Sequence, residues 1–479
     1  MQPATSKREV AKVAIYSVLI LGLGVLATAC SKAPTSPTTS GGVQIRIWRT
    51  GQAEDAIKSN IAQFKAKNKS ANLTITYDNR DIETYEVDAL KSLGARTGPD
   101  IWSIPNDWLG DHVPRIQPIP ANYFFPLDSK GKRQTTGPSP AEQVKELFPE
   151  GISEQLIGTD GESVLGLPTN VDSLRLYYNR ELFSAAATEF QKSLGSGAKS
   201  EDFTPVKTLF SKAPATWGDV LEMEKYLTKL DGNTVVRSAI ALGTADNVSK
   251  SADIVSLLIL QNGAKVVSVD RKNALFHIPT TSPSGVVVSP GELALDFFTS
   301  FSNPAKASYT WNPSMPQDLD AFGQGRVAMV IAFTDFEAQL KIKYPRFRFD
   351  TAAVPQNSVT QAPVNLIKFN IETVTKTADN TAAAFAFLPY YADQSHAVNL
   401  ASQANLTSPY TIDLDRKKTD PLVSQIITGK SIFKRSREQF DQSFRQMIID
   451  VSQNGLTNAK ALDSAADRIN VLLQADNQL

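Results

Sequence analysis

The sequence is poor in cysteine and histidine and has no excess of charge of either sign. Cys30 is the only cysteine, so the chain cannot form a disulfide with itself. Its histidines, His112, His277 and His396, are far apart in the chain, and no pair has the short spacing of a zinc site. Lysine plus arginine and aspartate plus glutamate both number 49, which leaves no positive field to hold nucleic-acid phosphates. We therefore expect no metal site and no nucleic-acid partner.

Two common catalytic motifs are also missing. The chain has no Gly-x-Ser-x-Gly turn and no Gly-x-x-x-x-Gly-Lys-Ser/Thr loop, which argues against a serine hydrolase and against a nucleotide-driven engine. Carboxylates such as Asp78, Asp81 and Glu83 are too common to identify a glycosidase pair, because that pair is defined by a separation of about 5 to 10 Å in space. We expect no catalytic residue and no cofactor.

The first 29 residues have the pattern of a secretory signal peptide. Three basic residues, Lys7, Arg8 and Lys12, precede an almost wholly apolar run over residues 13–29 that ends in small side chains. The stretch Leu-Ala-Thr-Ala-Cys that ends at Cys30 resembles a lipobox, the site at which bacterial lipoproteins are diacylated and cleaved. Here alanine stands where leucine is usual. An uncleaved anchor helix is the alternative, and either reading places the body outside the cytoplasm.

The rest of the chain has the composition of a folded protein of more than one domain. Of its 479 residues, 42% are hydrophobic and 20% charged, and this length exceeds what one hydrophobic core usually serves. Residues 30–42 hold the cysteine and a run of proline, serine, threonine and glycine, which predicts a flexible tether. No further membrane segment follows it.

Hydrophobic periodicity after the tether alternates between strand and helix. The first segments predict a mostly parallel α/β sheet, and later segments predict longer helices, one of them with Thr216 as its N-cap. The expected strands are 43–47, 73–77 and 99–104, and the expected helices are 54–67, 85–93, 217–230, 440–453 and 459–473.

Several segments, in this order, resemble the extracellular solute-binding proteins of ABC importers, family 1, the group that includes the maltose-binding protein. Their order is more specific than any single one, and together they cover most of residues 43–473. The segments are LGLPTNVDSLRLYYNRELF, PATWGDVLEMEKYLTKL, DLDAFGQGRVAMVIAF, AVP at residues 353–355, TADNTAAAFAFLPYYAD and LDSAADRINVLL. Residues 188–212 look like an insertion into the family pattern.

This resemblance implies a periplasmic-binding-protein-like fold of class α/β, with two discontinuous lobes joined by hinge crossings and a cleft between them. The N-terminal lobe would hold residues 43–158 plus 313–349, and the C-terminal lobe residues 159–312 plus 350–479. It also implies a non-enzymatic protein that closes over a small solute and delivers it to the permease subunits of an ABC transporter. The lipid on Cys30 would attach it to the cell membrane.

The candidate ligand residues are aromatic and polar side chains near strand ends and crossings. Ligands of open α/β sheets bind beyond the carboxyl ends of strands, and sugars need flat aromatic faces with polar groups at the edges. Each candidate has an ordinary structural alternative: core packing for the aromatic residues, hinge structure for the crossings, and a helix N-cap for Asp335. The candidates are Trp48, Trp102, Asn106, Asp107, Trp108, Asn170, Asp172, Trp311, Asp335, Phe336, Asn365 and Phe369.

The chemistry of the solute stays open at this point. The tryptophans and the resemblance favour a sugar or oligosaccharide, and a polyamine, an organic anion or a peptide would be a non-sugar alternative. A secreted, lipid-anchored carbohydrate-active enzyme is the alternative from another class, and two facing carboxylates would be its mark. A third possibility is a surface adhesin that kept the fold without a ligand.

Overall fold

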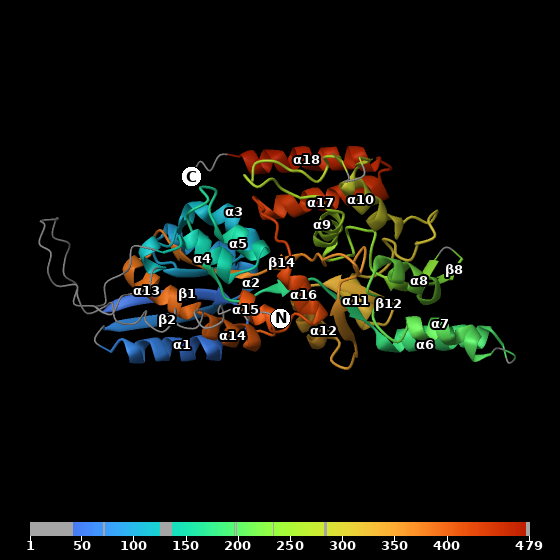
Figure 1. The fold of residues 1–479 in the computed structure, drawn as a ribbon, viewed down its shortest axis with the longest axis horizontal. Coiled ribbons are helices and arrows are strands. Elements are labelled where there is room, and N and C mark those ends of the chain that lie inside the picture. The colour runs from blue at the N-terminus through green and yellow to red at the C-terminus, as the bar shows by residue number, and fades with distance from the viewer. Residues whose placement is uncertain are drawn as a thin grey trace, which may run out of the picture. The chain divides into compact units, whose positions relative to one another are not determined.

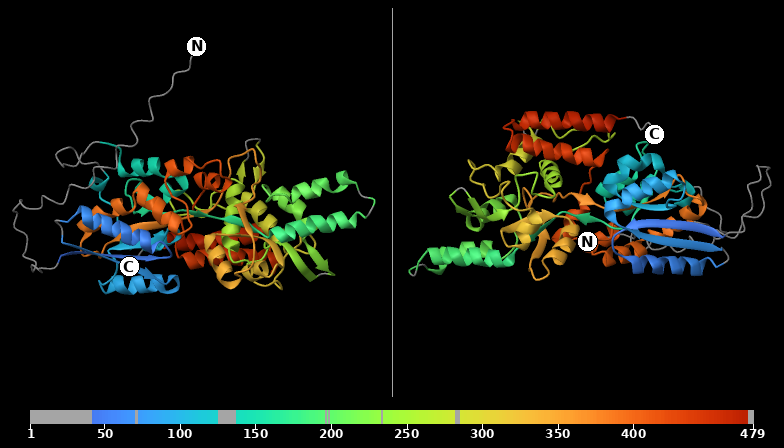
Figure 2. Two further views of the ribbon diagram at one scale, coloured as in Figure 1. Left: turned by 90° about the horizontal axis from the view of Figure 1, so that it is seen from below. Right: turned by 180° about the vertical axis from the view of Figure 1, so that it is seen from behind.

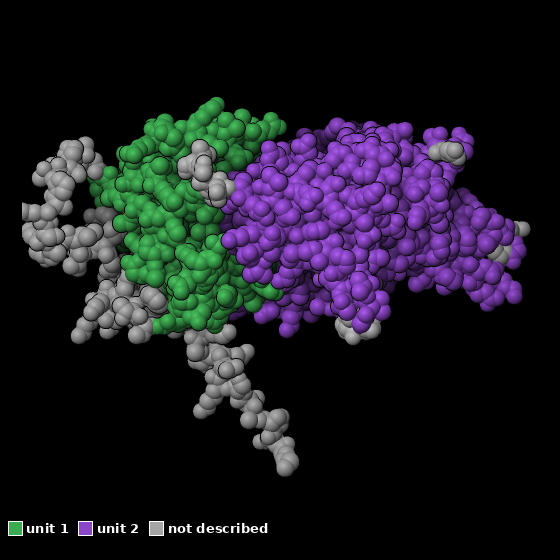
Figure 3. All heavy atoms as spheres, turned by 90° about the horizontal axis from the view of Figure 1, so that it is seen from above, with its two compact units in different colours: residues 1–106, 112–171, 369–411 green, residues 107–111, 172–368, 412–479 purple. Residues whose placement is uncertain are grey.

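A computed structural model of the chain describes residues 42–69, 72–124, 137–195, 197, 199–232, 234–281 and 285–475. The expected signal peptide, the lipidation at Cys30 and all but the last residue of the tether lie outside the described residues. Contacts within the chain divide it into two compact units (Figure 3). Unit 1 is formed by Met1–Asn106, His112–Val171 and Phe369–Thr411, and unit 2 by Asp107–Asp111, Asp172–Lys368 and Ile412–Leu479.

Unit 1 is built on one six-stranded sheet (Figure 1). Its strands β2, β1 and β3 are parallel, and β15 joins them antiparallel and pairs in turn with β4 and β5. The strands are β1 (Val43–Thr50), β2 (Leu73–Arg80), β3 (Ile101–Pro105), β4 (Ile116–Gln117), β5 (Leu167–Pro168) and β15 (Asn370–Thr375).

Two helices of unit 1, α1 and α2, correspond to the helices expected over residues 54–67 and 85–93, and two others, α13 and α14, come from a much later part of the chain. Both α13 and α14 pack against α1, the first helix of the chain. The helices are α1 (Glu54–Lys67), α2 (Ile82–Gly94), α4 (Pro140–Leu147), α5 (Glu150–Leu156), α13 (Thr381–Tyr391) and α14 (Gln394–Gln403), with the short turns η2 (Val113–Arg115) and η3 (Ala121–Tyr123). The turns η1 (Asn106–Trp108), α3 (Leu109–His112) and α15 (Thr411–Asp415) lie where the chain changes unit.

Unit 2 has a five-stranded sheet in the order β13-β7-β12-β9-β8, with β12 parallel to β9 and antiparallel to β7. All six residues of the central strand β12 are buried, as a strand covered on both faces requires. Its strands are β7 (Arg175–Tyr178), β8 (Lys229–Asp231), β9 (Thr234–Ile240), β12 (Val327–Ala332) and β13 (Asp350–Ala353), with two small pairs, β6 (Asp172–Ser173) with β14 (Ile367–Lys368) and β10 (Thr280–Thr281) with β11 (Val287–Val288).

The helices of unit 2 surround this sheet, and their buried side chains form most of the hydrophobic core of the unit. The hairpin of α6 and α7 projects from the rest of the unit, as both views in Figure 2 show, and it contains most of the expected insertion. The helices are α6 (Arg180–Ser193), α7 (Ser200–Leu209), α8 (Trp217–Leu227), α9 (Ser251–Gln261), α10 (Pro290–Ser300), α11 (Asp318–Gly323), α12 (Thr334–Lys343), α16 (Pro421–Ile427), α17 (Arg437–Ser452) and α18 (Asn458–Gln474).

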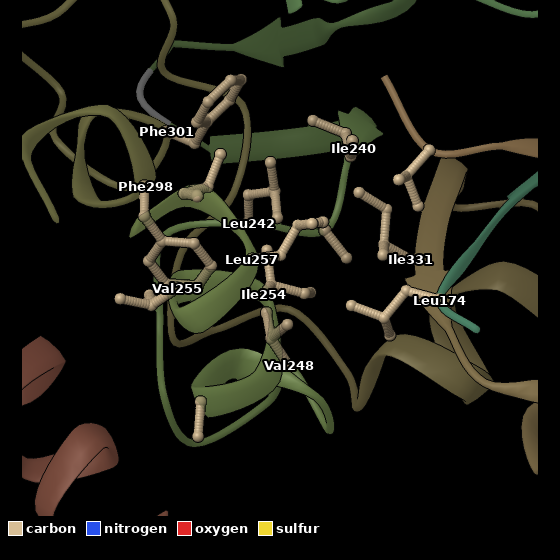
Figure 4. Packing of buried hydrophobic residues seen from close by; sticks show 14 of the residues in the cluster. Leu174, Ile240, Leu242, Val248, Ile254, Val255, Leu257, Phe298, Phe301 and Ile331 are labelled. Carbon is tan, nitrogen blue, oxygen red and sulfur yellow. The ribbon is translucent and has the colours of Figure 1, made fainter. Parts of the chain in front are cut away.

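The core of unit 2 is centred on α9, nearly all of whose residues are buried. Figure 4 shows Ile254 and Leu257 of this helix packed toward Ile240 and Ile331 from neighbouring strands, with Phe298 of α10 on another side. A helix that is apolar all round must lie inside a protein, because it offers no face to water. None of the described helices has the length and apolarity that crossing a membrane would require.

The division into units differs from the expected lobes in several segments. Residues 313–349 lie in unit 2, because β12 pairs with β7 and β9 of that unit. Residues 369–411 lie in unit 1, because β15 pairs with β3, β4 and β5. The boundary expected after residue 158 comes after Val171, and residues 107–111 already belong to unit 2. Strand pairing at long range therefore decides the division, and the local pattern of each segment carries no information about it.

Candidate functional site

Six of the candidate residues lie within two positions of a point where the chain passes from one unit to the other. Asn106 flanks the first passage with Asp107 and Trp108, Asn170 and Asp172 flank the third, and Phe369 begins the part of unit 1 that follows the fourth. Asn106 also follows β3 directly, as a residue beyond the carboxyl end of a strand should.

In unit 1, two asparagine side chains hold the backbone around Phe369. The amide oxygen Oδ1 of Asn106 accepts a hydrogen bond from the Phe369 N–H at 3.0 Å, and the Asn106 N–H donates to the Phe369 carbonyl at 2.9 Å. Oδ1 of Asn170 accepts from the N–H of Asn370 at 3.2 Å. Its Nδ2 is buried and has no hydrogen-bond partner within the described part of the chain. This Nδ2 is therefore a polar donor at the end of the sheet that the unit's own groups leave unused.

A buried network that sequence reasoning missed lies beside these residues. Oε1 of Glu372, on β15, accepts hydrogen bonds from NH1 of Arg49 at 2.7 Å, from Oγ of Ser103 at 2.9 Å and from Oγ1 of Thr169 at 3.0 Å. Arg49 is 1% exposed and Glu372 is fully buried. Burial raises the pKa of Tyr391, whose hydroxyl lies 3.3 Å from Arg49 NH1. The network links strands β1, β3 and β15 to Thr169, which lies just before the passage that follows Val171.

The two tryptophans of unit 1 are neighbours in the sheet, in register between β1 and β3. Trp48 is 5% exposed, and the guanidinium of Arg80 lies over its ring at 3.8 Å, a cation–π contact. Trp102 is completely buried, and its ring lies 4.7 Å from that of His112. Trp102 is thus part of the core, whereas the ring of Trp48, near the end of β1, is covered by the guanidinium of Arg80.

In unit 2, Asp107 belongs to a cluster of charged side chains. Nζ of Lys368 lies 3.3 Å from Asp253 and 3.5 Å from Asp107, and Nζ of Lys434 lies 2.5 Å from Asp441 and 3.6 Å from Asp253. Burial alone would raise the pKa of Asp253, but the two ammonium groups outweigh it and hold that pKa well below its ordinary value. Burial raises the pKa of Asp441.

Aromatic faces accompany this cluster. Lys368 Nζ lies 4.7 Å from the ring centre of Phe333, and the guanidinium of Arg437 lies 5.4 Å from the ring centre of Trp108. Because each carboxylate of the cluster faces an ammonium group, the cluster offers fixed hydrogen-bond donors and acceptors beside aromatic rings. Such a combination suits a hydroxylated, C–H-rich solute.

The segment that carries Asp107 and Trp108 is anchored to unit 2 at its other end. The two carboxylate oxygens of Asp111 accept hydrogen bonds from the N–H groups of Ser436, at 2.5 Å, and Arg437, at 3.2 Å, where α17 begins. Ser436 makes no side-chain cap of its own, so Asp111 takes that role. At Gly110 a Cβ atom would lie 2.0 Å from the carbonyl oxygen of Lys434, so the close approach requires glycine.

Asp172 caps a helix of unit 2. Its Oδ2 accepts from the backbone N–H of Thr334 at 3.0 Å and from the Thr334 hydroxyl at 2.6 Å, where α12 begins. Burial raises the pKa of Asp172. Asp335 is not the N-cap, because α12 begins at Thr334 and Phe333 occupies the N-cap position. The carboxylate of Asp335 is 51% exposed and pairs with Lys250 at 3.0 Å.

Three further candidates are held by contacts inside unit 2. Trp311 is completely buried, and its Nε1 donates to Thr244 and Asn247. Asn365 is also fully buried, and its Nδ2 donates to the Leu174 carbonyl at 2.8 Å. Phe336 is 3% exposed and packs against Tyr177. These contacts give each of the three side chains a structural role within unit 2.

Two α/β units joined by several passages of the chain, with polar and aromatic side chains at those passages, define a class of protein that binds a small solute. The model of the bacterial extracellular solute-binding proteins matches residues 50–396, and the chain belongs to this family. Proteins of this family bind solutes and are not catalysts, which confirms that the chain is not an enzyme. None of the described residues forms a group of histidine, cysteine or carboxylate side chains able to hold a metal ion.

Solved structures of solute-binding proteins share the fold over nearly the whole chain. The cyclic α-maltosyl-1,6-maltose binding protein of Arthrobacter globiformis is 16% identical with a TM-score of 0.65, covering 91% of this chain and 100% of its own. The sugar-binding protein MalE of Xanthomonas citri is 16% identical with a TM-score of 0.63, covering 90% and 97%.

A third example is an ABC transporter solute-binding protein of Thermotoga lettingae, solved with α-D-tagatose. It is 17% identical with a TM-score of 0.56, and the match covers 90% of this chain and 99% of that one. At these identities the likeness concerns the fold, and it confirms the expected periplasmic-binding-protein-like class. None of the curated proteins matches the chain in sequence.

Proposed function

We propose that the protein is a lipid-anchored, extracytoplasmic solute receptor that delivers a sugar or oligosaccharide to the permease subunits of an ABC importer. The observation that carries this proposal is the family match over residues 50–396, because the proteins of this family bind solutes outside the cell. The structures that share the fold include a cyclic α-maltosyl-1,6-maltose binding protein, a sugar-binding protein and a solute-binding protein solved with α-D-tagatose, which favours a sugar.

We propose that the solute is held by the candidate residues near the passages of the chain. Trp48, near the end of β1, and Trp108 supply aromatic surface, and Asn106, Asp107, Asn170, Asp172 and Phe369 lie at the passages of the chain. The unused Nδ2 of Asn170 and the cluster around Asp107 provide donors and acceptors for hydroxyl groups. For Trp102, Trp311, Asp335, Phe336 and Asn365, the contacts already described provide a structural role.

The proposal is tested by screening the purified chain for thermal stabilisation against neutral sugars, polyamines, organic anions and short peptides. A true solute at 100 times its dissociation constant stabilises the chain by about 2.7 kcal/mol. Stabilisation by a mono- or oligosaccharide, absent from a Trp108→Ala and Asp107→Ala double variant that keeps the wild-type melting temperature without ligand, supports the sugar and the site together. Stabilisation only by a polyamine, an organic anion or a peptide overturns the sugar.

The lipid anchor is tested separately, because it concerns residues outside the described structure. Mass spectrometry of the protein from its native membrane should show a mature chain that begins at a diacylated Cys30. A Cys30→Ser variant should be released from the membrane, since acyl chains contribute about 0.8 kcal/mol per buried methylene. A chain that retains residues 1–29 and stays on the membrane would instead establish the uncleaved anchor helix.

A further inference from the structure

We infer that unit 2 carries a second ligand site, an open groove that binds an acidic sugar through its carboxylate. The groove has a volume of about 900 Å³. It is lined by the first turns of α6, by α12 and by the extended segment that leads into β13; α6 and α12 are labelled in Figure 1. None of its lining residues belongs to the candidate set for the principal solute, so this site does not depend on the proposed function.

The groove has an aromatic wall of two fixed rings. Phe347 and Phe349 both line it, with ring centres 6.3 Å apart and planes inclined by only 20°. Both rings also contact the fully buried Phe322, at 4.9 Å and 6.2 Å, and are thereby held in place. Rings that need not be ordered on binding offer an apolar surface to the C–H face of a sugar at little entropic cost.

Two ion pairs supply polar groups around this wall. The guanidinium of Arg180 pairs with the carboxylate of Asp350, and Lys341 pairs with Glu337 at 2.5 Å. Arg180 and Lys341 are largely exposed, so the pairs lie where a ligand can reach them. Each pair presents both donors and acceptors, the combination that hydroxyl groups use.

The lining holds three basic and three acidic side chains, and the two ion pairs leave Arg348 and Glu181 without an ion-pair partner among the described residues. Arg348 is exposed and makes no ion pair or side-chain hydrogen bond with the described residues. The remaining acidic side chain of the lining, Glu181, lies in the first turn of α6, where the positive end of the helix dipole stabilises it. The guanidinium of Arg348, which lines the same groove as the two rings, can bind a planar carboxylate through two parallel hydrogen bonds. An acidic sugar has both the carboxylate and the C–H face that this wall requires.

The test is calorimetric titration of the whole chain with D-galacturonate, with D-galactose as the neutral counterpart. We expect D-galacturonate to bind and D-galactose to bind at least about 10-fold more weakly, since a charge-assisted pair is lost. Arg348→Gln should weaken D-galacturonate binding about 10-fold. Arg348→Lys should have an affinity between those of wild type and Arg348→Gln, because lysine keeps the positive charge but lacks the paired N–H donors of the guanidinium. Arg346→Gln is the matched control: Arg346 is also exposed but does not line the groove.

Three results would overturn the inference: no heat of binding with D-galacturonate up to tens of millimolar, equal affinity of wild type and Arg348→Gln, or equal weakening by Arg346→Gln. If benzoate binds as tightly as D-galacturonate, the site takes carboxylates in general and the assignment to a sugar is wrong. A Trp108→Ala variant should keep the wild-type affinity for D-galacturonate. Loss of binding in that variant would place the ligand at the principal site and overturn the second one.

Discussion

The carboxylate of Glu372 accepts a hydrogen bond from the guanidinium of Arg49 at 2.7 Å, and both side chains are almost wholly buried in unit 1. The two residues come from β1 and β15, which are separated by β3 in the sheet. Ser103 of β3 donates to the same carboxylate oxygen, so the pair links all three strands. A buried charge pair that also has hydrogen bonds from neutral groups is costly to break by removing one member.

We therefore predict that Arg49→Met lowers the free energy of unfolding of unit 1 by about 3 to 5 kcal/mol, because Glu372 is left buried without its counter-charge. The double variant Arg49→Met with Glu372→Met should be more stable than Arg49→Met alone. Urea unfolding followed by fluorescence measures the free energies. Arg180→Met, which removes the exposed ion pair with Asp350, is the control and should cost less than about 1 kcal/mol. Equal losses in the two single variants would show that burial of the Arg49 pair is unimportant.

A second prediction concerns pH and rests on Glu224 of α8. Burial raises the pKa of this side chain to about 7 from an ordinary value of 4.5, and the hydrogen bond from Thr228 offsets only part of that effect. Because the folded state binds the proton more tightly, the contribution of Glu224 to stability is fully present below about pH 4.5. It is lost as the pH rises through about 7.

Glu224→Gln should therefore raise the melting temperature at pH 8 relative to wild type by more than it does at pH 5. The difference between the two pH values should be roughly 2 to 3 kcal/mol in the free energy of unfolding. Glu222→Gln, on the same helix but exposed and paired with Lys225, should show no such pH dependence. A Glu224 variant whose effect is the same at both pH values would contradict a raised pKa.

A third prediction separates two tryptophans that the sequence could not rank. Trp311→Phe should lower stability by about 1 to 3 kcal/mol, because Thr244 and Asn247 lose the indole donor in a fully buried site. It should leave the affinity for the principal solute unchanged. Trp108→Phe should weaken that affinity while changing stability less. Thermal unfolding and calorimetric titration of both variants decide the matter, and a loss of affinity in Trp311→Phe would place that residue at the solute instead.

A fourth prediction uses two glycines. Gly110→Ala should destabilise the segment that carries Asp107 and Trp108, because its Cβ would lie 2.0 Å from the Lys434 carbonyl oxygen. We expect a clear fall in melting temperature together with weaker solute binding. Gly94→Ala is the matched control, since a Cβ there meets nothing within 4 Å, and it should change neither quantity much. A Gly110→Ala variant that binds normally would show that this segment does not hold the solute.

Local structure was largely predictable from the sequence. The helix expected over residues 54–67 has those bounds, and Thr216 caps α8 through the N–H of Asp219, as its position before the helix indicated. The expected helix over 217–230 ends earlier, at Leu227, because residues 229–231 form the edge strand β8. The late helical pair is present as α17 and α18. Such features depend on side chains a few positions apart, which the sequence displays directly.

The candidate site was predictable only in part. Strand ends could be placed from the chain order, which is why Asn106 and Asp107 lie directly beyond β3, but the points where the chain changes unit could not. The partners of those residues could not be placed. Nothing near Asp107 in the sequence points to Lys368, and nothing near Arg49 points to Glu372, because each pair is brought together by a sheet.

By itself the sequence determined the class of fold, the membership of the family and most helices and strands, since periodicity and motif order are local properties of the chain. The tertiary structure alone decided which segments belong to which unit. It assigned β12 to one sheet and β15 to the other, and it buried Trp311 within unit 2. The physical reason is that backbone hydrogen bonds between strands and the exclusion of water from a core join residues that are distant in sequence.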